Sequence, residues 1–234
     1  MIEAAVQGCL SNEFSGCITG PVSKKVIADS GFHFTGHTEF LGELCGKKPL
    51  MSFISETMRL ALATTHVSLK EIPELINADM IASACEIISN DLKLYFTKSE
   101  PTIGILGLNP HAGENGLLGS EEQEIIIPVI EQLQQQGFDI CGPLAADTAF
   151  LQELNLDLVL SFYHDQALPL FKYVNPHLAA NVSLGLGIIR TSVDHGIALD
   201  QAGTQGANHQ SLYFALNTAK EMASHAENKN SHTA

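Results

Sequence analysis

Three histidines come at the ends of apolar, strand-like runs, one histidine to each run. They are His66, His111 and His164. In an open α/β sheet the carboxyl ends of the strands are where ligands bind, so these imidazoles would meet at one edge. Three neutral imidazoles with an open coordination position suit Zn²⁺ or another first-row divalent ion. Because a lone histidine at a strand end usually only forms a hydrogen bond, spacing alone leaves both roles open.

A glycine-rich loop follows the second of these runs. It contains His111 together with Gly113, Gly116 and Gly119. Such loops can let backbone N–H groups approach a phosphate or a metal-bound oxygen. The spacing matches neither a dinucleotide-binding fingerprint nor a P-loop, so the alternative is a mobile surface loop.

Basic residues are scarce, which makes two of them notable. Arg190 ends an apolar run and precedes Thr191 and Ser192, a combination suited to bidentate capture of phosphate or carboxylate. An ordinary surface ion pair is an equally good interpretation of Arg190. Lys172 lies eight residues after His164, so it could reach the same site or cover a helix face.

Composition excludes several classes of protein. Of the 234 residues, 45% are hydrophobic and 16% are charged, which is typical of a globular chain. A formal net charge of -14 opposes binding to nucleic acid. The apolar runs are too short to span a membrane, and the first ten residues lack the basic region of a secretory signal. We therefore expect a soluble cytoplasmic protein whose five scattered cysteines are reduced.

Short β-rich runs alternate with longer helical ones, a pattern that predicts an α/β fold built from βα units around a largely parallel sheet. The predicted strands are residues 17–19, 50–54, 59–64, 102–108, 156–162, 181–184 and 188–191. The predicted helices are residues 78–96, 121–136 and 210–223. Ser120 and Gln123 have the spacing of a capping box at the start of the second helix. We expect the polar tail from residue 227 to fray.

Five short motifs, in sequence order, resemble the signatures of the 4-hydroxythreonine-4-phosphate dehydrogenase family of pyridoxal phosphate biosynthesis. They are GHTEF from Gly36, ATTH from Ala63, GLNPHAGE from Gly107, YHDQ from Tyr163 and IRTSVDHGIA from Ile189. The resemblance extends from about residue 3 to about residue 222. Five separate motifs in one order make it specific.

The resemblance implies a two-domain α/β/α fold similar to isocitrate and isopropylmalate dehydrogenases. Residues 36–187 would form the metal-binding, substrate-binding and dimerisation domain, and the active site would be shared between two copies. Residues 1–35 and 188–234 would form a remnant of the first, cofactor-side domain. Family members begin with a strand and a loop that have no counterpart here, a stretch on the order of a hundred residues, so we expect an N-terminally truncated first domain.

The implied reaction is oxidation of 4-phosphooxy-L-threonine by NAD with the help of a divalent metal. The 2-amino-3-oxo acid that results would decarboxylate to 3-amino-2-oxopropyl phosphate. The family match assigns the metal to His66, His111 and His164, with zinc expected and magnesium or cobalt as alternatives. It assigns substrate contacts to His37, Thr38, Lys172, Asn181 and Arg190.

The segment from His195 to Asn208 also looks like the adenine-binding loop of the isocitrate dehydrogenase group, which makes these two residues the cofactor candidates. Their alternative is a glycine-rich loop in which Asn208 caps the last helix. Lys172 and Asp165 are candidates for proton transfer because they are close in sequence to His164. The family match, however, assigns Lys172 only to substrate contact.

Three other functions compete with this interpretation. A sibling dehydrogenase would act on D-threonate or D-erythronate 4-phosphate, which present the same chemical groups. An inactive metal-binding dimeric fragment is the second, because an incomplete first domain predicts metal binding with weak or absent NAD-linked oxidation. A three-histidine hydrolase is disfavoured because no HExxH motif supplies a base.

Overall fold

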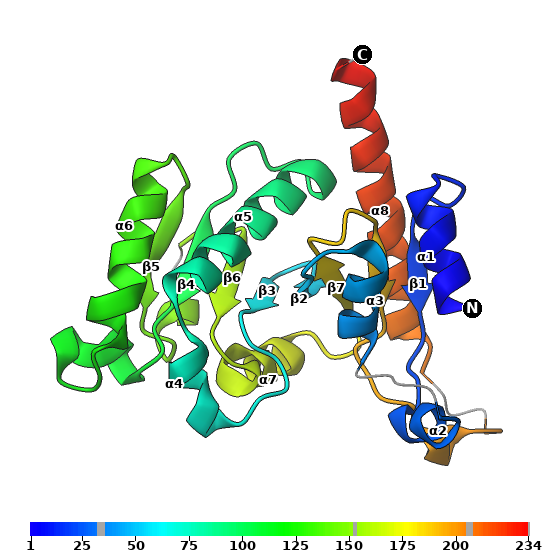
Figure 1. Cartoon of the computed structure of the whole chain (residues 1–234), viewed down its shortest axis with the longest axis horizontal. Coiled ribbons are helices and arrows are strands. Elements are labelled where there is room, and N and C mark those ends of the chain that lie inside the picture. Colours follow the sequence, from blue (N-terminus) through cyan, green and yellow to red (C-terminus); the bar gives the residue numbers. More distant parts are fainter. Residues whose placement is uncertain (32–35, 152–153, 205–207, 234) are drawn as a thin grey trace. The chain divides into compact units, whose positions relative to one another are not determined.

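The computed structural model describes residues 1–31, 36–151, 154–204 and 208–233 (Figure 1). It contains two compact units. Unit 1 consists of Met1–Glu56 and Asn175–Ala234, and unit 2 consists of Thr57–Val174. The sequence-based boundaries, at residues 35/36 and 187/188, lie elsewhere. Residues 36–56 and 175–187 belong to unit 1. They are held there because strand β2 (Leu50–Ser55) pairs along its whole length with β7 (Ala179–Leu184).

Unit 1 contains a mixed sheet. Its strands lie in the order β1 (Cys17–Thr19), β8 (Arg190–Ser192), β7, β2. Strand β1 is parallel to β8, whereas β7 runs antiparallel to both β8 and β2. The sheet is therefore less uniformly parallel here than the sequence predicts.

Helices cover both faces of the sheet in unit 1. On one face, α1 (Ile2–Leu10) and α3 (His37–Cys45) enclose a core of apolar side chains that includes Cys17. The long helix α8 (Gln210–Thr233) packs against β7, β8 and β1. Successive strand residues point to opposite faces, and Ile18 indeed lies beside α8 while Cys17 packs with α1 and α3. A short helix, α2 (Lys24–Asp29), completes the unit.

Unit 2 contains a fully parallel sheet, as the sequence predicts. Its strands lie in the order β3 (Arg59–Leu62), β6 (Leu158–Ser161), β4 (Ile103–Leu106), β5 (Ile140–Leu144). Every residue of β4 and β6 is buried, which explains their continuous apolar sequences. The helices of unit 2 are α4 (Ile72–Leu75), α5 (Ala78–Tyr95), α6 (Ile127–Gln135) and α7 (His164–Val174).

Helix α5 confirms its prediction from the sequence. It begins after Asn77, whose side-chain oxygen accepts a hydrogen bond of 2.9 Å from the backbone N–H of Met80. This side chain satisfies one of the N–H groups that a helix start leaves without a partner. On the apolar face, Ile81, Ile88 and Leu92 are completely buried.

Some predictions about helix ends are wrong. The helix predicted at residues 121–136 is confirmed at residues 121–135, although the turn at its start, Glu122–Ile126, is wound as a π-helix that continues directly into α6. The N-cap of this turn is Glu121, and the capping box occurs instead at Ser68 and Glu71. Helix α8 continues through the polar tail to Thr233, where the sequence predicts fraying.

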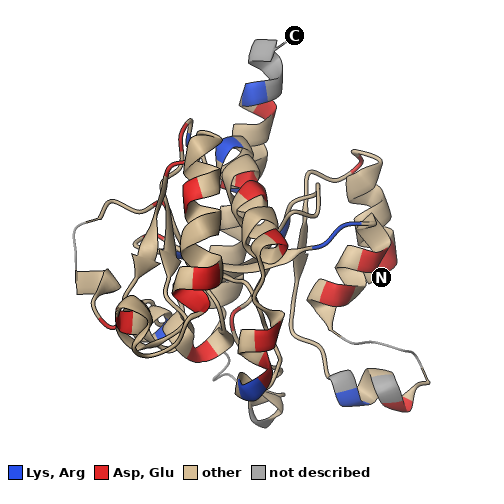
Figure 2. Cartoon of the chain, turned by 60° about the vertical axis from the view of Figure 1, so that its left-hand side comes forward, with Lys and Arg blue, Asp and Glu red and all other residues tan. Residues whose placement is uncertain are grey.

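The surface chemistry agrees with the composition. Figure 2 shows acidic residues on most of the helices and far fewer basic ones. Within the described ranges, no helix is both long and apolar enough to cross a bilayer. All five cysteines are free thiols. Burial raises the pKa of Cys17 and of Cys85 to about 12, which keeps both thiols protonated and unreactive at neutral pH.

Candidate functional site

The three histidines singled out in the sequence follow neighbouring strands of unit 2. His66 follows β3, His164 is the first residue of α7 directly after β6, and His111 follows β4. Strand β6 pairs in parallel with both β3 and β4. The predicted placement of all three histidines after the carboxyl ends of adjacent strands is confirmed.

Two of these imidazoles lie close together. The ring centres of His66 and His164 are 5.8 Å apart, with an angle of 39° between the ring planes. Thr64 connects the strand ends that carry them, because its N–H and its hydroxyl both donate to the carbonyl of Phe162, at 3.1 and 2.7 Å. This contact extends the pairing of β3 with β6 beyond the strands themselves and brings the two histidines side by side.

The spacing of the pair fits two ligands of one metal ion. A Zn–N bond of about 2.0–2.1 Å puts the centre of a ligating ring roughly 3.2 Å from the ion. Two such rings at a tetrahedral angle have centres about 5 Å apart. The observed 5.8 Å between His66 and His164 is close to that value. These two residues therefore fit a divalent ion in both chemistry and spacing.

Asp165 orients one member of the pair. Its Oδ1 lies 2.8 Å from Nδ1 of His164, while its own side chain is largely exposed. In the tautomer with a proton on Nδ1, His164 donates to Asp165 and keeps the lone pair of Nε2 for a metal. This contact favours an orienting role for Asp165, and its role in proton transfer stays a prediction.

His111 does not join the pair. Its side chain is 63% exposed, and its Nε2 lies 3.8 Å from Oδ2 of Asp147. Among the described residues of one chain, no three metal-ligating side chains are grouped closely enough to hold an ion. A single copy thus brings together two of the three predicted ligands, and a complete site requires a third donor.

The turn that carries His111 has an unusual backbone. Five consecutive residues, His111, Ala112, Gly113, Glu114 and Asn115, have φ angles of 53°, 51°, 77°, 45° and 58°. This left-handed region costs an L-residue with a side chain on the order of 1–2 kcal/mol, whereas glycine enters it freely. Tertiary contacts must stabilise this turn, because its sequence disfavours it.

The glycines of this loop make room for side chains of the protein itself. A Cβ on Gly113 would lie 2.6 Å from Oε2 of Glu122, and a Cβ on Gly119 would collide with the side-chain amide of Asn109. Both glycines are therefore required by close packing inside the loop. The loop is anchored by Glu122 and Asn109, in contrast to the mobile surface loop considered as an alternative from the sequence.

Arg190, in unit 1, is buried among neutral acceptors. Its side chain donates from Nη1 to Asn181 at 3.1 Å and to Ser183 at 3.0 Å, and from Nη2 to Thr19 at 2.7 Å. The residue is only 2% exposed. A surface ion pair, the alternative interpretation of Arg190, is therefore wrong.

The electrostatics of Arg190 favour an anion as its ligand. Burial lowers the pKa of its guanidinium to about 10, which still leaves it charged at neutral pH. Its Nε is buried and has no hydrogen-bond partner within the described part of the chain. A buried cation surrounded by neutral acceptors retains most of its desolvation cost, and a bound phosphate or carboxylate would offset that cost.

Two of the arginine's partners were not singled out from the sequence. Ser183 could have been found, because it is two residues after Asn181 on β7 and shares its face of the sheet. Thr19 gives no such signal. It reaches Arg190 because β1 and β8 pair in parallel, with Cys17 opposite Arg190 in the register.

The other predicted substrate residues lie on helices. His37 and Thr38 are the first two residues of α3 and are partly buried, in unit 1. Lys172 is exposed on α7, in unit 2. It follows His164 by eight residues, which is about 12 Å along a helix axis. None of these placements tests the predicted substrate contacts.

The two cofactor candidates make local contacts. His195 is exposed, and its Nδ1 lies 2.8 Å from the carbonyl oxygen of Gly196. The side-chain oxygen of Asn208 accepts a hydrogen bond of 2.9 Å from the N–H of Gln210, the first residue of α8. These contacts agree with the local interpretation of the loop. Residues 205–207, between the two candidates, lie outside the described residues.

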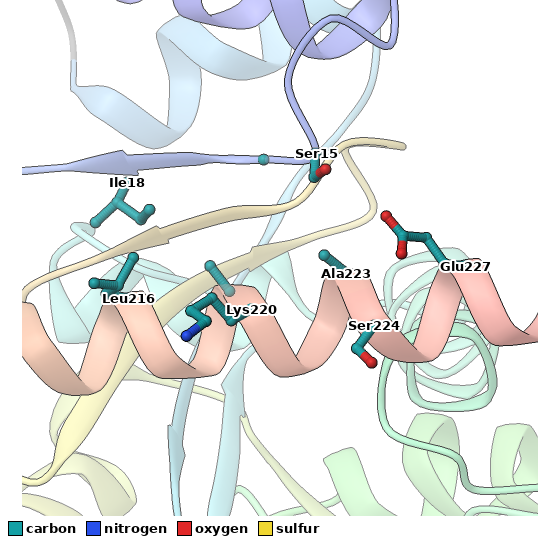
Figure 3. Close-up of a pocket in the computed structure, with 9 residues that line it drawn as sticks. Ser15, Ile18, Leu216, Lys220, Ala223, Ser224 and Glu227 are labelled. Carbon is teal, nitrogen blue, oxygen red and sulfur yellow. The ribbon is translucent and has the colours of Figure 1, made fainter.

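A pocket of about 340 Å³ lies between β1 and α8 in unit 1 (Figure 3). Ile18 from the strand and Leu216 from the helix face one another at one end, and Glu227 lies toward the other end. None of the residues predicted to bind metal, substrate or cofactor lines this pocket. The pocket therefore shares no residue with the histidine pair or with Arg190 and its hydrogen-bond partners.

Comparisons with known proteins agree with each other. A family model described as pyridoxal phosphate biosynthetic protein PdxA matches residues 1–219. A 4-hydroxythreonine-4-phosphate dehydrogenase from Marinobacter nauticus is 48% identical over 222 residues, covering 94% of this chain and 66% of the relative. One from Pseudomonas syringae pv. tomato is 50% identical over 222 residues, covering 94% and 68%.

A crystal structure of 4-hydroxythreonine-4-phosphate dehydrogenase from Klebsiella pneumoniae has the same fold. It superposes with a TM-score of 0.85 at 32% identity, covering 95% of this chain and 68% of that one. The chain thus spans about two thirds of the length of the relatives it matches.

Proposed function

Because the chain belongs to the pyridoxal phosphate biosynthetic protein PdxA family, we propose that it takes part in the 4-hydroxythreonine-4-phosphate dehydrogenase reaction. The substrate is 4-phosphooxy-L-threonine, which NAD oxidises to a 2-amino-3-oxo acid. That acid loses CO₂ and gives 3-amino-2-oxopropyl phosphate. The observation that carries the proposal is the pair of adjacent imidazoles, His66 and His164, after neighbouring parallel strands.

The imidazole pair is the proposed metal site. His66 and His164 hold a divalent ion, zinc in the first instance, with magnesium or cobalt as alternatives. His111 is the third ligand, and we assign it to a second copy of the chain because it does not join the pair within one copy. A bound ion of this kind lowers the pKa of a substrate hydroxyl and stabilises the negative charge that develops on oxygen.

Exposed apolar side chains that follow the histidines in the sequence are consistent with a homodimer with a shared active site. Leu69 follows His66 and is 69% exposed. Leu117, six residues after His111, is 80% exposed, and Tyr173 on α7 is 85% exposed. Contiguous apolar patches mark surfaces that a partner covers, and we propose that these three side chains lie in such a surface. A second copy of the same chain is the partner that would also supply the third ligand.

Arg190 is the proposed anchor for the substrate phosphate. Its guanidinium is held by Asn181, Ser183 and Thr19 before any ligand arrives. A guanidinium that is already held in place loses little conformational freedom on binding, and it can hold a phosphate with two parallel hydrogen bonds. His37, Thr38 and Lys172 are proposed to make the remaining substrate contacts.

The cofactor and the location are proposed with the reaction. NAD accepts the hydride, and the segment bounded by His195 and Asn208 binds its adenine end. Lys172 and Asp165 are the candidates for moving a proton. Residues 1–35 and 188–234 would serve the cofactor, and residues 36–187 the metal, the substrate and the dimer. The enzyme would work in the cytoplasm on a small phosphorylated substrate, with no nucleic-acid or membrane partner.

A substrate panel tests the proposal. The chain is assayed for NADH formation from 4-phosphooxy-L-threonine, D-threonate 4-phosphate and D-erythronate 4-phosphate, with and without added divalent ion. We expect the first substrate to have the highest kcat/KM and activity to depend on the ion. A preference for either of the other phosphates identifies the sibling dehydrogenase instead. If the ion binds and all three compounds are inert, the chain is a metal-binding fragment without this activity.

A further inference from the structure

A carboxylate is buried under the turn that carries His111. It belongs to Glu122, the first residue of the π-helical turn Glu122–Ile126, and the residue has no exposed surface. Single π turns inside α-helices are rare and frequently mark functional sites. The predicted site residues and the proposed function assign no role to Glu122.

Glu122 binds the chain just before the turn. One carboxylate oxygen accepts from the backbone N–H of Asn109 at 2.7 Å, and the other accepts from the Asn109 side-chain amide at 2.9 Å. The same amide donates to Glu121 at 2.7 Å. Asn109 is separated from His111 only by Pro110, whose ring restricts the backbone. Fixing both donors of Asn109 therefore fixes the direction in which the chain enters the turn.

The same carboxylate packs directly against the turn. Oε2 of Glu122 occupies the space beside Gly113, where an added Cβ would lie only 2.6 Å away. Oε1 lies 3.3 Å from the position of a Cβ on Gly107, at the end of β4. Glu122 thus contacts both the entry and the middle of a backbone that is left-handed from His111 to Asn115.

The contacts of Glu122 require a carboxylate. Glutamine has the same shape, and its oxygen could still accept from the N–H of Asn109. Its NH₂ group would then face the NH₂ group of Asn109, donor against donor. A charged group at a fully buried position is costly unless its acceptor capacity is used, and here both oxygens are used. The site is therefore built around this carboxylate and these two amide donors.

We infer that Glu122 is a positioning residue for His111: acting through Asn109, its buried carboxylate holds the left-handed turn from which the His111 imidazole is presented. The inference rests on the proposed function for its link to the metal. The geometry of the turn itself can be tested without any metal. Partners that orient a metal ligand typically change metal affinity about 10–100-fold when they are replaced.

The test compares Glu122→Gln with Glu124→Gln, a matched change at an exposed position of the same helical turn. Histidine imidazole signals are recorded by NMR on the metal-free protein, and Zn²⁺ and Co²⁺ affinities are measured by titration. We expect Glu122→Gln to shift the His111 signal while those of His66 and His164 stay in place. We also expect metal affinity to fall about 10–100-fold. Glu124→Gln should change neither.

A double-variant experiment separates positioning from general destabilisation. In a His111→Ala background, Glu122→Gln should cause little further loss of metal affinity, because the ligand it positions is already gone. An equal loss in both backgrounds would overturn the inference. So would an unchanged His111 signal in the metal-free Glu122→Gln protein. If Glu122→Gln does not fold, Asn109→Ala, which removes only the side-chain donor, is tested against the same criteria.

The outcome also distinguishes this inference from the proposed function. If the protein binds no divalent ion, the proposed metal site fails, and the His111 signal still decides whether Glu122 holds the turn. If the ion binds but neither the His111 signal nor the metal affinity changes in Glu122→Gln, the positioning role of Glu122 is wrong and the proposed metal site still stands.

Discussion

The imidazole rings of His66 and His164 lie 5.8 Å apart, centre to centre, although they are 98 positions apart in the sequence. The hydroxyl of Thr64 and the carbonyl of Phe162 join the strand ends from which they come. This arrangement places two metal-binding side chains together before any ion is bound. It follows that the fold should survive removal of the ion, because neutral imidazoles tolerate its absence.

The first prediction concerns metal content. His66→Ala and His164→Ala should each lower the bound divalent ion to well under half of the wild-type value, because a single remaining imidazole of the pair binds weakly. His209→Ala, at an exposed position of unit 1, is the control and should leave metal content unchanged. Elemental analysis of the purified proteins measures the effect, and circular dichroism after chelation checks the fold. Full metal content in His66→Ala, His111→Ala and His164→Ala alike would rule out this site.

The second prediction concerns sharing of the site between copies. If His66 and His164 come from one copy and His111 from the other, a heterodimer of His66→Ala with His111→Ala contains one intact site of two. A heterodimer of His66→Ala with His164→Ala contains none. Metal binding should therefore recover in the first mixture and not in the second, as measured on isolated heterodimers. Recovery in neither would mean that each site is built within one chain.

Much of the framework around the pair could be predicted from the sequence. Strands β3, β4 and β6 are buried and parallel, so their apolar runs are continuous and easy to recognise. Strand β5, Ile140–Leu144, was missed because Gly142 and Pro143 lie inside it and most of it is only half-buried.

The details of the site were harder to predict, for physical reasons. His111, Ala112 and Glu114 all disfavour a left-handed backbone, so local preference gives the wrong answer for this turn. The turn depends on a contact with Glu122, and the conformational preferences of the residues in the turn do not reveal that contact. Likewise, the contact of Thr19 with Arg190 joins residues 171 positions apart, and only the pairing of β1 with β8 creates it.

The third prediction tests the link between the strand ends. Thr64→Val keeps the shape of a buried side chain but removes its hydroxyl donor to Phe162. We expect the free energy of unfolding to fall by about 0.5–1.5 kcal/mol, the usual net value of one hydrogen bond. Urea denaturation measures it. Metal affinity should fall as well, because His66 is two residues away.

Thr65→Val is the matched control for Thr64→Val, since it makes the same change at the next residue, which is only partly buried. It should change stability by less than Thr64→Val does. If the two variants lose equal stability and equal metal affinity, the hydroxyl of Thr64 has no special role in joining β3 to β6.

The last prediction concerns the buried guanidinium of Arg190. Arg190→Lys keeps a positive charge but removes the planar fork that donates to Asn181, Ser183 and Thr19. We expect the Kd for inorganic phosphate and for 4-phosphooxy-L-threonine to rise about tenfold or more, which corresponds to about 1.4 kcal/mol. Loss of hydrogen bonds to buried acceptors should also lower the free energy of unfolding by about 1–3 kcal/mol.

Two further variants make the experiment on Arg190 specific. Arg59→Lys makes the same change in unit 2, where Arg59 donates to the carbonyl of Asp157 and stacks over Phe96. It should reduce stability and leave phosphate binding intact. Ser183→Ala removes one of the three acceptors and keeps the guanidinium, so it should weaken phosphate binding less than Arg190→Lys does. Calorimetric titration with phosphate gives all the affinities. Equal phosphate affinity in the Arg190→Lys protein and the wild type would show that the phosphate is bound elsewhere.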